Sequence, residues 1–186
     1  MTRFLALAAG LLAMAAQPVG AAEWKMDRGA SRLEFAATFE KAAAPGVFKD
    51  FDARLSFAPD KPGDGRLDVT IAVSSADMSS GEVNKAIGGP EWFDFARFPQ
   101  AEFHATEIRR AEAGGYVARG TLTLKGVPQP VEVPFAWTET GDGARMTGEF
   151  AVKRGAFGIG TGEWAATSVI GADVKIRFDI RLRKGG

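Results

Sequence analysis

The chain contains no cysteine and only one histidine. Without cysteine it has no disulfides, no thiolate metal sites and no cysteine nucleophile. A zinc site normally gathers three or four His, Cys or carboxylate ligands, so a single histidine is a poor start for one. No motif assembles a nucleophile, a base and an orienting group. We therefore expect a protein that is not an enzyme and that carries no resident metal or cofactor.

An excess of charge of one sign is also lacking. The 23 Lys and Arg residues balance 23 Asp and Glu residues, and both signs alternate along the chain. Proteins that bind nucleic acid or anionic membranes through bulk charge carry a basic excess. The sequence therefore predicts no nucleic-acid partner.

Long hydrophobic runs are absent except near the start, where the thirteen residues 4–16 are apolar and follow Arg3. This run is shorter than the roughly 20 residues that a membrane span needs. Gln17 and Pro18 end it, and the small residues 19–22 follow. This pattern predicts a signal peptide over 1–22, cleaved after Ala22, and one domain over 23–186. An exported protein without cysteine is typical of a bacterial periplasm.

The remaining chain is dominated by strict alternation of apolar and polar residues. In 66–75, for example, Leu67, Val69, Ile71 and Val73 alternate with polar neighbours. Such alternation predicts half-buried strands. The segments concerned are 32–40, 47–57, 66–75, 101–109, 115–124, 131–137, 145–153 and 173–183.

Eight strands with short connections predict an antiparallel all-β domain, either a barrel or a sandwich. Asp142 and Gly143 supply a tight hairpin turn. Several segments run nine to eleven residues, longer than the usual five or six, and this length favours a closed barrel. A sandwich remains the alternative, because alternation alone does not distinguish the two.

One long connection, 76–99, shows no alternation. Ser79 and Glu82 have the spacing of a capping box, which predicts a short helix over 82–87. The aromatic stretch EWFDFARFPQAEFHAT (91–106) follows and contains the only histidine. If Phe103 points inward, His104 faces solvent, which argues against imidazole catalysis. The glycines of FGIGTG (157–162) predict a bend in the barrel wall.

The abundance of rings predicts an apolar cavity inside the barrel, although such rings could also simply fill a core. Small residues at proposed inward positions favour some empty volume: Ala37, Ala53, Ala101, Ala105, Ala118, Gly120 and Gly148. The rings expected to contact a ligand are Phe35, Phe39, Phe51, Trp92, Phe93, Phe95, Phe98, Phe103, Phe135, Trp137, Phe150, Phe157, Trp164 and Phe178. The cations expected near its polar head are Arg97, Lys125, Lys153 and Arg154.

Four segments together resemble the YceI-like family of periplasmic polyisoprenoid-binding proteins, in the family's order. They are GVFKDFDARLSFAPD (46–60), EWFDFARFPQAEFHATEI (91–108), GTLTLKGVPQPVEVP (120–134) and VKRGAFGIGTGEWAATSVIGADVKI (152–176). The departures include Trp92, where the family often has Phe, and Ala105, where it often has a hydroxyl residue.

The resemblance implies an eight-stranded antiparallel, lipocalin-like barrel with a short helical lid segment. It also implies an isoprenoid lipid, polyprenyl or quinone-like, as the ligand in the barrel interior. An alternative is an interaction module with a packed interior that partners a membrane-bound cytochrome. A small hydrolase or isomerase is a third hypothesis, and a homodimer is left open.

Overall fold

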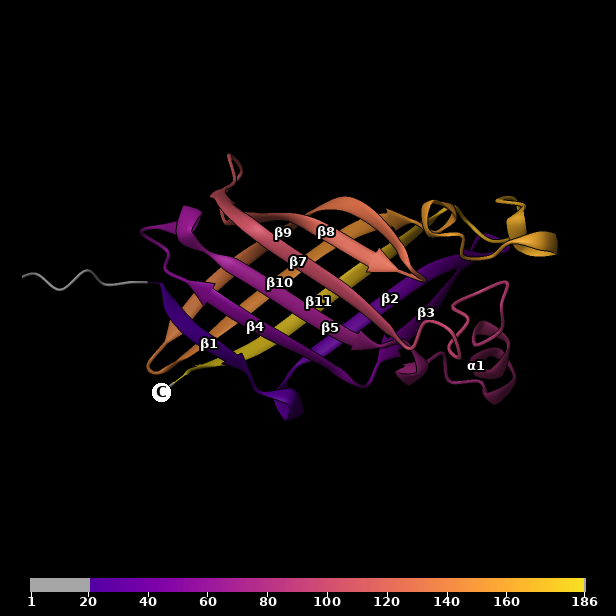
Figure 1. Ribbon diagram of the computed structural model, residues 1–186, viewed down its shortest axis with the longest axis horizontal. Helices are drawn as coiled ribbons and strands as arrows, with labels where there is room; N and C mark the ends of the chain where they lie inside the picture. The colour runs from indigo at the N-terminus through magenta and orange to yellow at the C-terminus, as the bar shows by residue number, and fades with distance from the viewer. Residues whose placement is uncertain (1–20, 186) are drawn as a thin grey trace, which may run out of the picture.

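The computed structural model describes residues 21–185 and is an antiparallel β-barrel with extra segments at one end (Figure 1). Residues 1–20 of the expected signal peptide lie outside the described residues. The strands are β1 (Ala22–Met26), β2 (Arg32–Phe39), β3 (Ala42–Phe48), β4 (Phe51–Phe57), β5 (Arg66–Ala72), β6 (Ala76–Asp77), β7 (Gln100–Arg110), β8 (Tyr116–Leu124), β9 (Val127–Thr140), β10 (Gly143–Lys153) and β11 (Asp173–Lys184).

Eight strands close the barrel in the order β1-β4-β5-β7-β8-β9-β10-β11, and β11 pairs with β1 to complete the ring. The other three strands, β2, β3 and β6, extend β1, β4 and β5, respectively. The 3-10 helix η1 (Arg28–Ala30) separates β1 from β2, and η3 (Val73–Ser75) separates β5 from β6. β2 pairs with β11 and β3, and β3 pairs with β6. The wall is thus eight long antiparallel strands, three of them kinked, which confirms the predicted barrel and excludes the sandwich.

All eight segments predicted from alternation contain a strand, but β1 and β6 were not predicted, and the predicted segment 47–57 joined the end of β3 to β4, so β3 was missed as a separate element. Its sequence, AAAPGVF, contains a proline and a glycine and shows no alternation. β3 forms because it pairs with β2 from Phe39↔Ala42 to Leu33↔Phe48. The predicted turn at Asp142 and Gly143 is displaced by one residue. The two turn residues are Gly141, which has a φ of 63°, and Asp142, and β10 begins at Gly143.

The end of the barrel where β1 begins and β11 ends, on the left in Figure 1, is closed by aromatic side chains. The Phe57 ring lies 4.9 Å from that of Tyr116 and 5.1 Å from that of Trp137, both edge to face. The Trp24 ring lies 5.1 Å from Trp137, and its Nε1 donates to the Phe57 carbonyl oxygen at 3.1 Å. We call Trp24, Phe57, Tyr116, Phe135 and Trp137 the aromatic plug. Four of the ring pairs pack edge to face, Tyr116 and Phe135 are stacked, and Trp24 and Phe57 are fully buried, so the interior is packed at this end.

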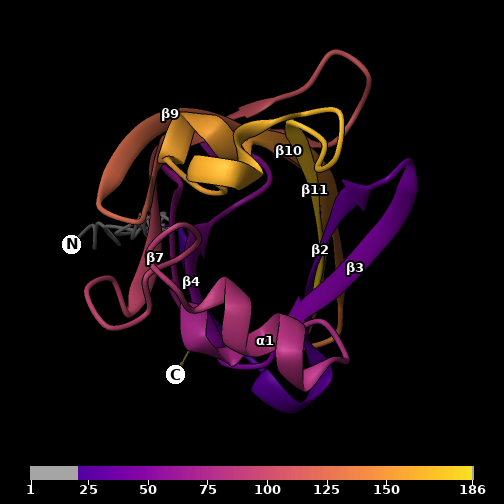
Figure 2. The ribbon, with the colours of Figure 1, turned by 90° about the vertical axis from the view of Figure 1, so that its right-hand side faces the viewer.

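The opposite end carries two irregular segments, seen end-on in Figure 2. We call residues 78–99, which contain α1 (Gly81–Ile87), the lid, and residues 154–172, which contain η4 (Arg154–Phe157) and η5 (Gly162–Ala165), the cap. The predicted helix is confirmed, with Ser80 as its N-cap accepting a hydrogen bond from the Val83 amide. The glycine-rich stretch 157–162 belongs to the cap, so the predicted bend in the barrel wall is wrong.

No helix within residues 21–185 is long and apolar enough to cross a membrane.

Candidate functional site

An apolar lumen runs along the barrel between the aromatic plug and the two end segments. Two adjoining cavities form it. The one nearer the middle has about 600 Å³ of space not filled by protein atoms, its open mouth included. The one below the lid and cap has about 690 Å³ measured in the same way. They share five lining side chains, Leu33, Ile71, Leu122, Phe150 and Ile176, so they adjoin inside the barrel.

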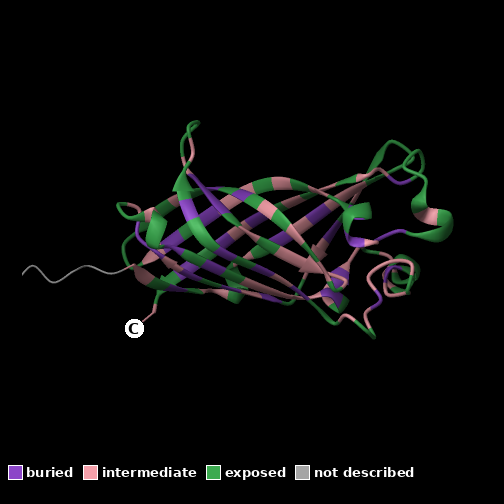
Figure 3. Ribbon diagram, turned by 45° about the horizontal axis from the view of Figure 1, so that its top comes forward, coloured by how far each residue is buried: buried purple, intermediate pink, exposed green. Residues whose placement is uncertain are grey.

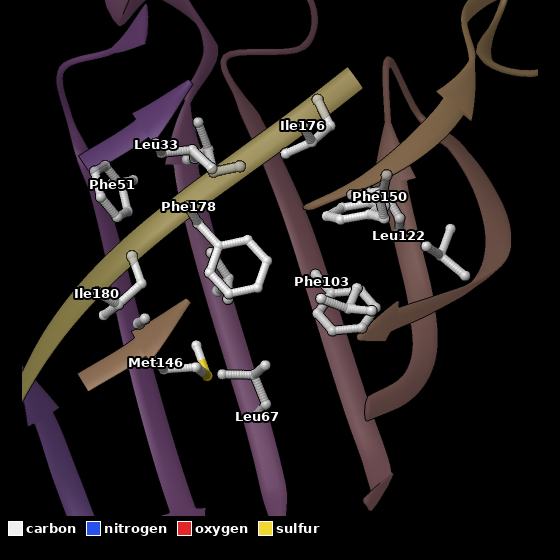
Figure 4. A pocket seen from close by; sticks show the side chains of 15 residues that line it. Leu33, Phe51, Leu67, Phe103, Leu122, Met146, Phe150, Ile176, Phe178 and Ile180 are labelled. Carbon is white, nitrogen blue, oxygen red and sulfur yellow. The ribbon is translucent and has the colours of Figure 1, made fainter. Parts of the chain in front are cut away.

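The middle cavity is lined only by apolar residues. Figure 4 shows side chains from strands on all sides converging on it, among them Phe103 from β7, Phe150 from β10 and Phe178 from β11. Alternation produces this lining, because every second residue of a strand points to the same face. On β5, for example, Leu67, Val69 and Ile71 all line the cavity.

The exposure of inward side chains distinguishes the lumen from a packed core. In the lumen Val69, Ile71 and Leu122 remain partly exposed although they point inward. Towards the plug, Leu55 and Phe57 have no exposed surface. Figure 3 shows this difference along the barrel as a change from buried to intermediate residues. A side chain that points inward and is still accessible faces unfilled space, so the side chains of this barrel do not fill it.

Half of the rings expected to contact a ligand line the lumen. They are Phe35, Phe51, Phe93, Phe103, Phe150, Phe157 and Phe178. Five of these seven are strand residues, Phe35, Phe51, Phe103, Phe150 and Phe178, whose inward phase and height along the barrel axis place them at the lumen.

Seven of the expected rings lie elsewhere. Phe135 and Trp137 point inward but belong to the aromatic plug, where they pack against Phe57. Phe39, at the end of β2, is 45 % exposed. The remaining four lie in the lid and cap, outside the lumen lining: Trp92, Phe95, Phe98 and Trp164. Their place in these irregular segments depends on tertiary contacts that alternation does not predict.

The aliphatic part of the lumen lining was not predicted from the sequence, because only aromatic side chains were expected to contact a ligand. These residues are Leu33, Leu67, Val69, Ile71, Leu122, Leu124, Val131, Val133, Met146, Val152, Ile159, Val174, Ile176 and Ile180. Phe48 and two alanines, Ala53 and Ala101, also line the lumen. The alternation that identified the strands already contained the signal, since most of these residues occupy the inward phase.

Among residues 21–185, Arg154 is the one charged residue in the lining of the two cavities, and it is 5 % exposed. Its Nε donates to the Gly171 carbonyl oxygen at 3.0 Å. Its two terminal nitrogens donate to the carbonyl oxygens of Ile159, Gly160, Trp164 and Ile170, at 2.8–3.0 Å. A guanidinium has five N–H donors, and all five are used by the backbone of the cap. Burial lowers the pKa of Arg154.

The other three cations expected near a polar head are differently placed. Arg97 is exposed, 3.6 Å from an oxygen of Asp94, with its guanidinium over the Phe98 ring. Lys153 is exposed and pairs with Asp173 at 3.1 Å. Lys125 lies between the lid and the cap, and burial lowers the pKa of its ammonium group. The four cations therefore do not form one cluster at the mouth of the lumen.

His104 lies on the outer wall, as its phase predicts. Its Nδ1 is 2.7 Å from an Asp68 carboxylate oxygen, and its Nε2 is 3.4 Å from a Glu102 oxygen. Hydrogen bonding to Asp68, and secondarily to Glu102, raises the pKa of the imidazole. It points away from the lumen and from any apolar ligand that the lumen would hold.

The lumen and barrel match a known family. The YceI-like domain model matches residues 24–182, almost all of the described chain. The chain belongs to the YceI-like family. A UPF0312 protein of Yersinia enterocolitica is 33 % identical over 141 residues, which cover 74 % of this chain and 73 % of that protein. A UPF0312 protein of Photorhabdus laumondii is 32 % identical over 130 residues, covering 68 % and 67 %.

Solved structures agree with this YceI-like assignment. The crystal structure of Burkholderia cenocepacia BcnA superposes with a TM-score of 0.80 at 33 % identity, covering 84 % of this chain and 98 % of BcnA. A polyisoprenoid-binding domain from Saccharophagus degradans, implicated in plant cell wall breakdown, superposes with a TM-score of 0.68 at 15 % identity. This alignment covers 87 % of this chain and 98 % of that domain, and its low identity makes it evidence of the shared barrel fold alone.

Proposed function

We propose that this protein is a periplasmic carrier that holds an isoprenoid lipid, polyprenyl or quinone-like, in the barrel lumen. The single observation that carries the proposal is the apolar lumen, in which inward side chains such as Val69, Ile71 and Leu122 remain partly exposed. The ligand class is taken from the name of the Saccharophagus domain, a polyisoprenoid-binding domain with the same barrel fold.

The chemistry of the lining fits a hydrocarbon better than a polar metabolite. Burial of a prenyl chain contributes about 0.8 kcal/mol for each CH₂-sized group. Ten buried carbons thus contribute roughly 8 kcal/mol, against an association cost of about 4 kcal/mol or more. Because the donors of Arg154 are all used within the cap, affinity comes from the apolar chain. This is binding without chemical change, consistent with a chain that is not an enzyme.

The cytochrome-partner hypothesis assumed a packed interior. Unfilled space along the lumen does not fit that assumption, so we favour the lipid carrier.

The proposal is tested by native mass spectrometry of protein isolated from the periplasmic fraction of a bacterial host. We expect a co-purifying lipid whose extract contains an isoprenoid. We also expect a polypeptide mass that corresponds to a chain beginning at Glu23, as the signal-peptide prediction requires. Repeated recovery of empty protein that also fails to bind added isoprenoids would reject the carrier role.

A matched pair of variants locates the ligand. Val69 lines the lumen, and its neighbour Thr70 lies on the opposite face of β5. Val69→Trp fills part of the lumen, so we expect lipid occupancy to fall by about tenfold, by analogy with the cost of overpacking a site. Thr70→Trp adds the same volume outside and should leave occupancy unchanged. Equal occupancy in the two variants would place the lipid elsewhere.

A further inference from the structure

The lid and the cap together cover the end of the lumen opposite the plug. Phe93 of the lid lines the cavity below the lid and cap, and so do Arg154, Phe157 and Ile159 of the cap. Figure 2 shows the two segments on opposite sides of the barrel end, with α1 facing the cap. Because the aromatic plug closes the other end, a ligand that enters along the barrel axis has to pass between these two segments.

Lys125 lies at the point where the lid and the cap meet. Its Nζ donates to the Pro90 carbonyl oxygen of the lid at 2.7 Å and to the Gly158 carbonyl oxygen of the cap at 2.8 Å. Lys125 and Gly126 are the two residues of the turn between β8 and β9, with φ of 51° and 74°. A non-glycine residue in this left-handed region is uncommon, and here its side chain points to the boundary between the lid and the cap.

Direct contacts between lid and cap lie beside Lys125. The Glu91 carbonyl oxygen of the lid accepts hydrogen bonds from the amides of Gly160 at 2.8 Å and Thr161 at 3.0 Å. The rings of Trp92 and Trp164 lie 5.8 Å apart across the same boundary. We call these contacts, with the two bonds of Lys125, the lid–cap seam.

The two segments are each anchored to the barrel apart from this seam. The cap is organised around the Arg154 guanidinium and is joined to β2 by the Gly171 amide, which donates to the Thr38 carbonyl oxygen at 2.8 Å. The lid is attached through an apolar cluster in which its Trp92, Phe93 and Phe95 rings pack around the buried residues Phe35, Ala76 and Ile87. Irregular segments that lie over the end of a sheet open locally at lower free energy than the whole fold. The lid can therefore separate from the cap while the barrel remains intact.

We propose that Lys125 is a positioning residue that controls ligand exchange: its ammonium group joins the lid to the cap, and the lumen is loaded and emptied when this seam opens. The inference rests on the proposed function only in taking an apolar ligand to occupy the lumen. It predicts that Lys125 determines the rate of exchange far more than the affinity, since Lys125 does not line the lumen.

The first test needs no ligand. Lys125→Met keeps the apolar stem and removes both donated bonds, and Lys153→Met is the matched control because Lys153 is exposed and bonds only to Asp173. We expect amide hydrogen exchange at Gly160 and Thr161 to quicken by about tenfold in Lys125→Met, since two charge-assisted bonds are lost. Lys153→Met should exchange like the wild type, and Lys125→Arg should restore slow exchange.

The second test measures loading of the apolar fluorophore N-phenyl-1-naphthylamine by stopped flow. In Lys125→Met, the uptake and release rates should both rise by about tenfold, and the dissociation constant should change by less than about threefold. Unchanged uptake in this variant overturns the proposal, whatever the amide exchange shows. Absence of fluorophore binding in every variant, with quickened exchange in Lys125→Met, would instead reject the lumen as a ligand site and leave the seam itself supported.

The absence of native cysteine permits a converse test. Cysteines introduced as Glu91→Cys and Thr161→Cys lie across the seam and can be joined by oxidation or by a short bis-thiol linker, verified by mass. The joined protein should take up the fluorophore at least tenfold more slowly, and cleavage of the disulfide should restore the wild-type rate. Wild-type uptake by the joined protein would show that ligands enter elsewhere and would overturn the proposal.

Discussion

At the scale of single residues, Arg154 shows how a charged side chain can line an apolar lumen without serving a ligand. Each of its five N–H donors is paired with a carbonyl oxygen of the cap. Gly160 permits this arrangement, because a Cβ at that position would collide with the guanidinium group. Its φ of 71° also favours glycine. Arg154 therefore determines the shape of the cap.

Replacement of this side chain tests that role. Arg154→Lys keeps the charge but offers three donors in place of five, so two or more buried carbonyl groups lose their partners. We expect the free energy of unfolding to fall by about 2–4 kcal/mol, measured by urea denaturation. The neighbouring substitution Lys153→Arg, at an exposed site, should change it by less than about 0.5 kcal/mol. A fully stable Arg154→Lys protein would contradict the role assigned to the five bonds.

At the scale of elements, Asp77 joins the start of the lid to the barrel wall. Its Oδ1 accepts hydrogen bonds from Asn84 Nδ2 and from the Ser79 amide, both at 2.9 Å, and its Oδ2 pairs with Lys49. These bonds, with that of Lys49 the largest, hold the pKa of the carboxyl group well below its ordinary value. The lid is thus fastened by the ionised form of one carboxylate.

This predicts how the lid responds to acid. A lowered pKa in the folded state means that the contribution of Asp77 to stability is complete above its ordinary pKa of about 3.9 and is lost as pH falls through the folded value. Asp77→Asn should therefore quicken amide exchange in α1 at pH 7, and the difference from the wild type should shrink as pH falls below about 4. Asp173→Asn, at an exposed pair with Lys153, is the control. A difference that does not vary with pH would contradict this assignment.

At the scale of the whole molecule, the barrel interior is divided along its axis into a packed part and an unfilled part. Phe57, in the plug, has no exposed surface, whereas Phe150 lines both cavities and is partly exposed. A fully buried ring loses its packing contacts when it is removed, while a ring that faces empty space has fewer to lose. Stability and ligand binding should therefore depend on different aromatic residues.

A pair of identical substitutions tests this division. Phe57→Ala should lower the free energy of unfolding by about 3–5 kcal/mol, and Phe150→Ala by about 1–2 kcal/mol. Fluorophore affinity should change in Phe150→Ala, because the ring lines the lumen, and should be retained in the folded fraction of Phe57→Ala. Equal losses of stability, or an affinity change confined to Phe57→Ala, would contradict the proposed division of the interior.

The small inward-facing residues show which part of the lumen could not be predicted from the sequence. Gly120 and Gly148 were expected to leave empty volume, but neither does. A Cβ at Gly148 would collide with the Phe178 ring, and one at Gly120 would collide with the His104 backbone of the neighbouring strand. Ala53 and Ala101, by contrast, do line the lumen. What lies beside a small residue depends on the neighbouring strand, which local sequence does not reveal.

The sequence by itself determined the strands and which of their side chains point inward, because alternation with a period of two is a local property of an extended chain. The YceI-like motifs determined the barrel class. Only the tertiary structure decided that Phe135 and Trp137 seal one end, that Phe103 and Phe150 face empty space, and that Lys125 joins the lid to the cap. The height of a side chain along the barrel is set by the register between strands far apart in sequence, and that register forms only when the barrel closes.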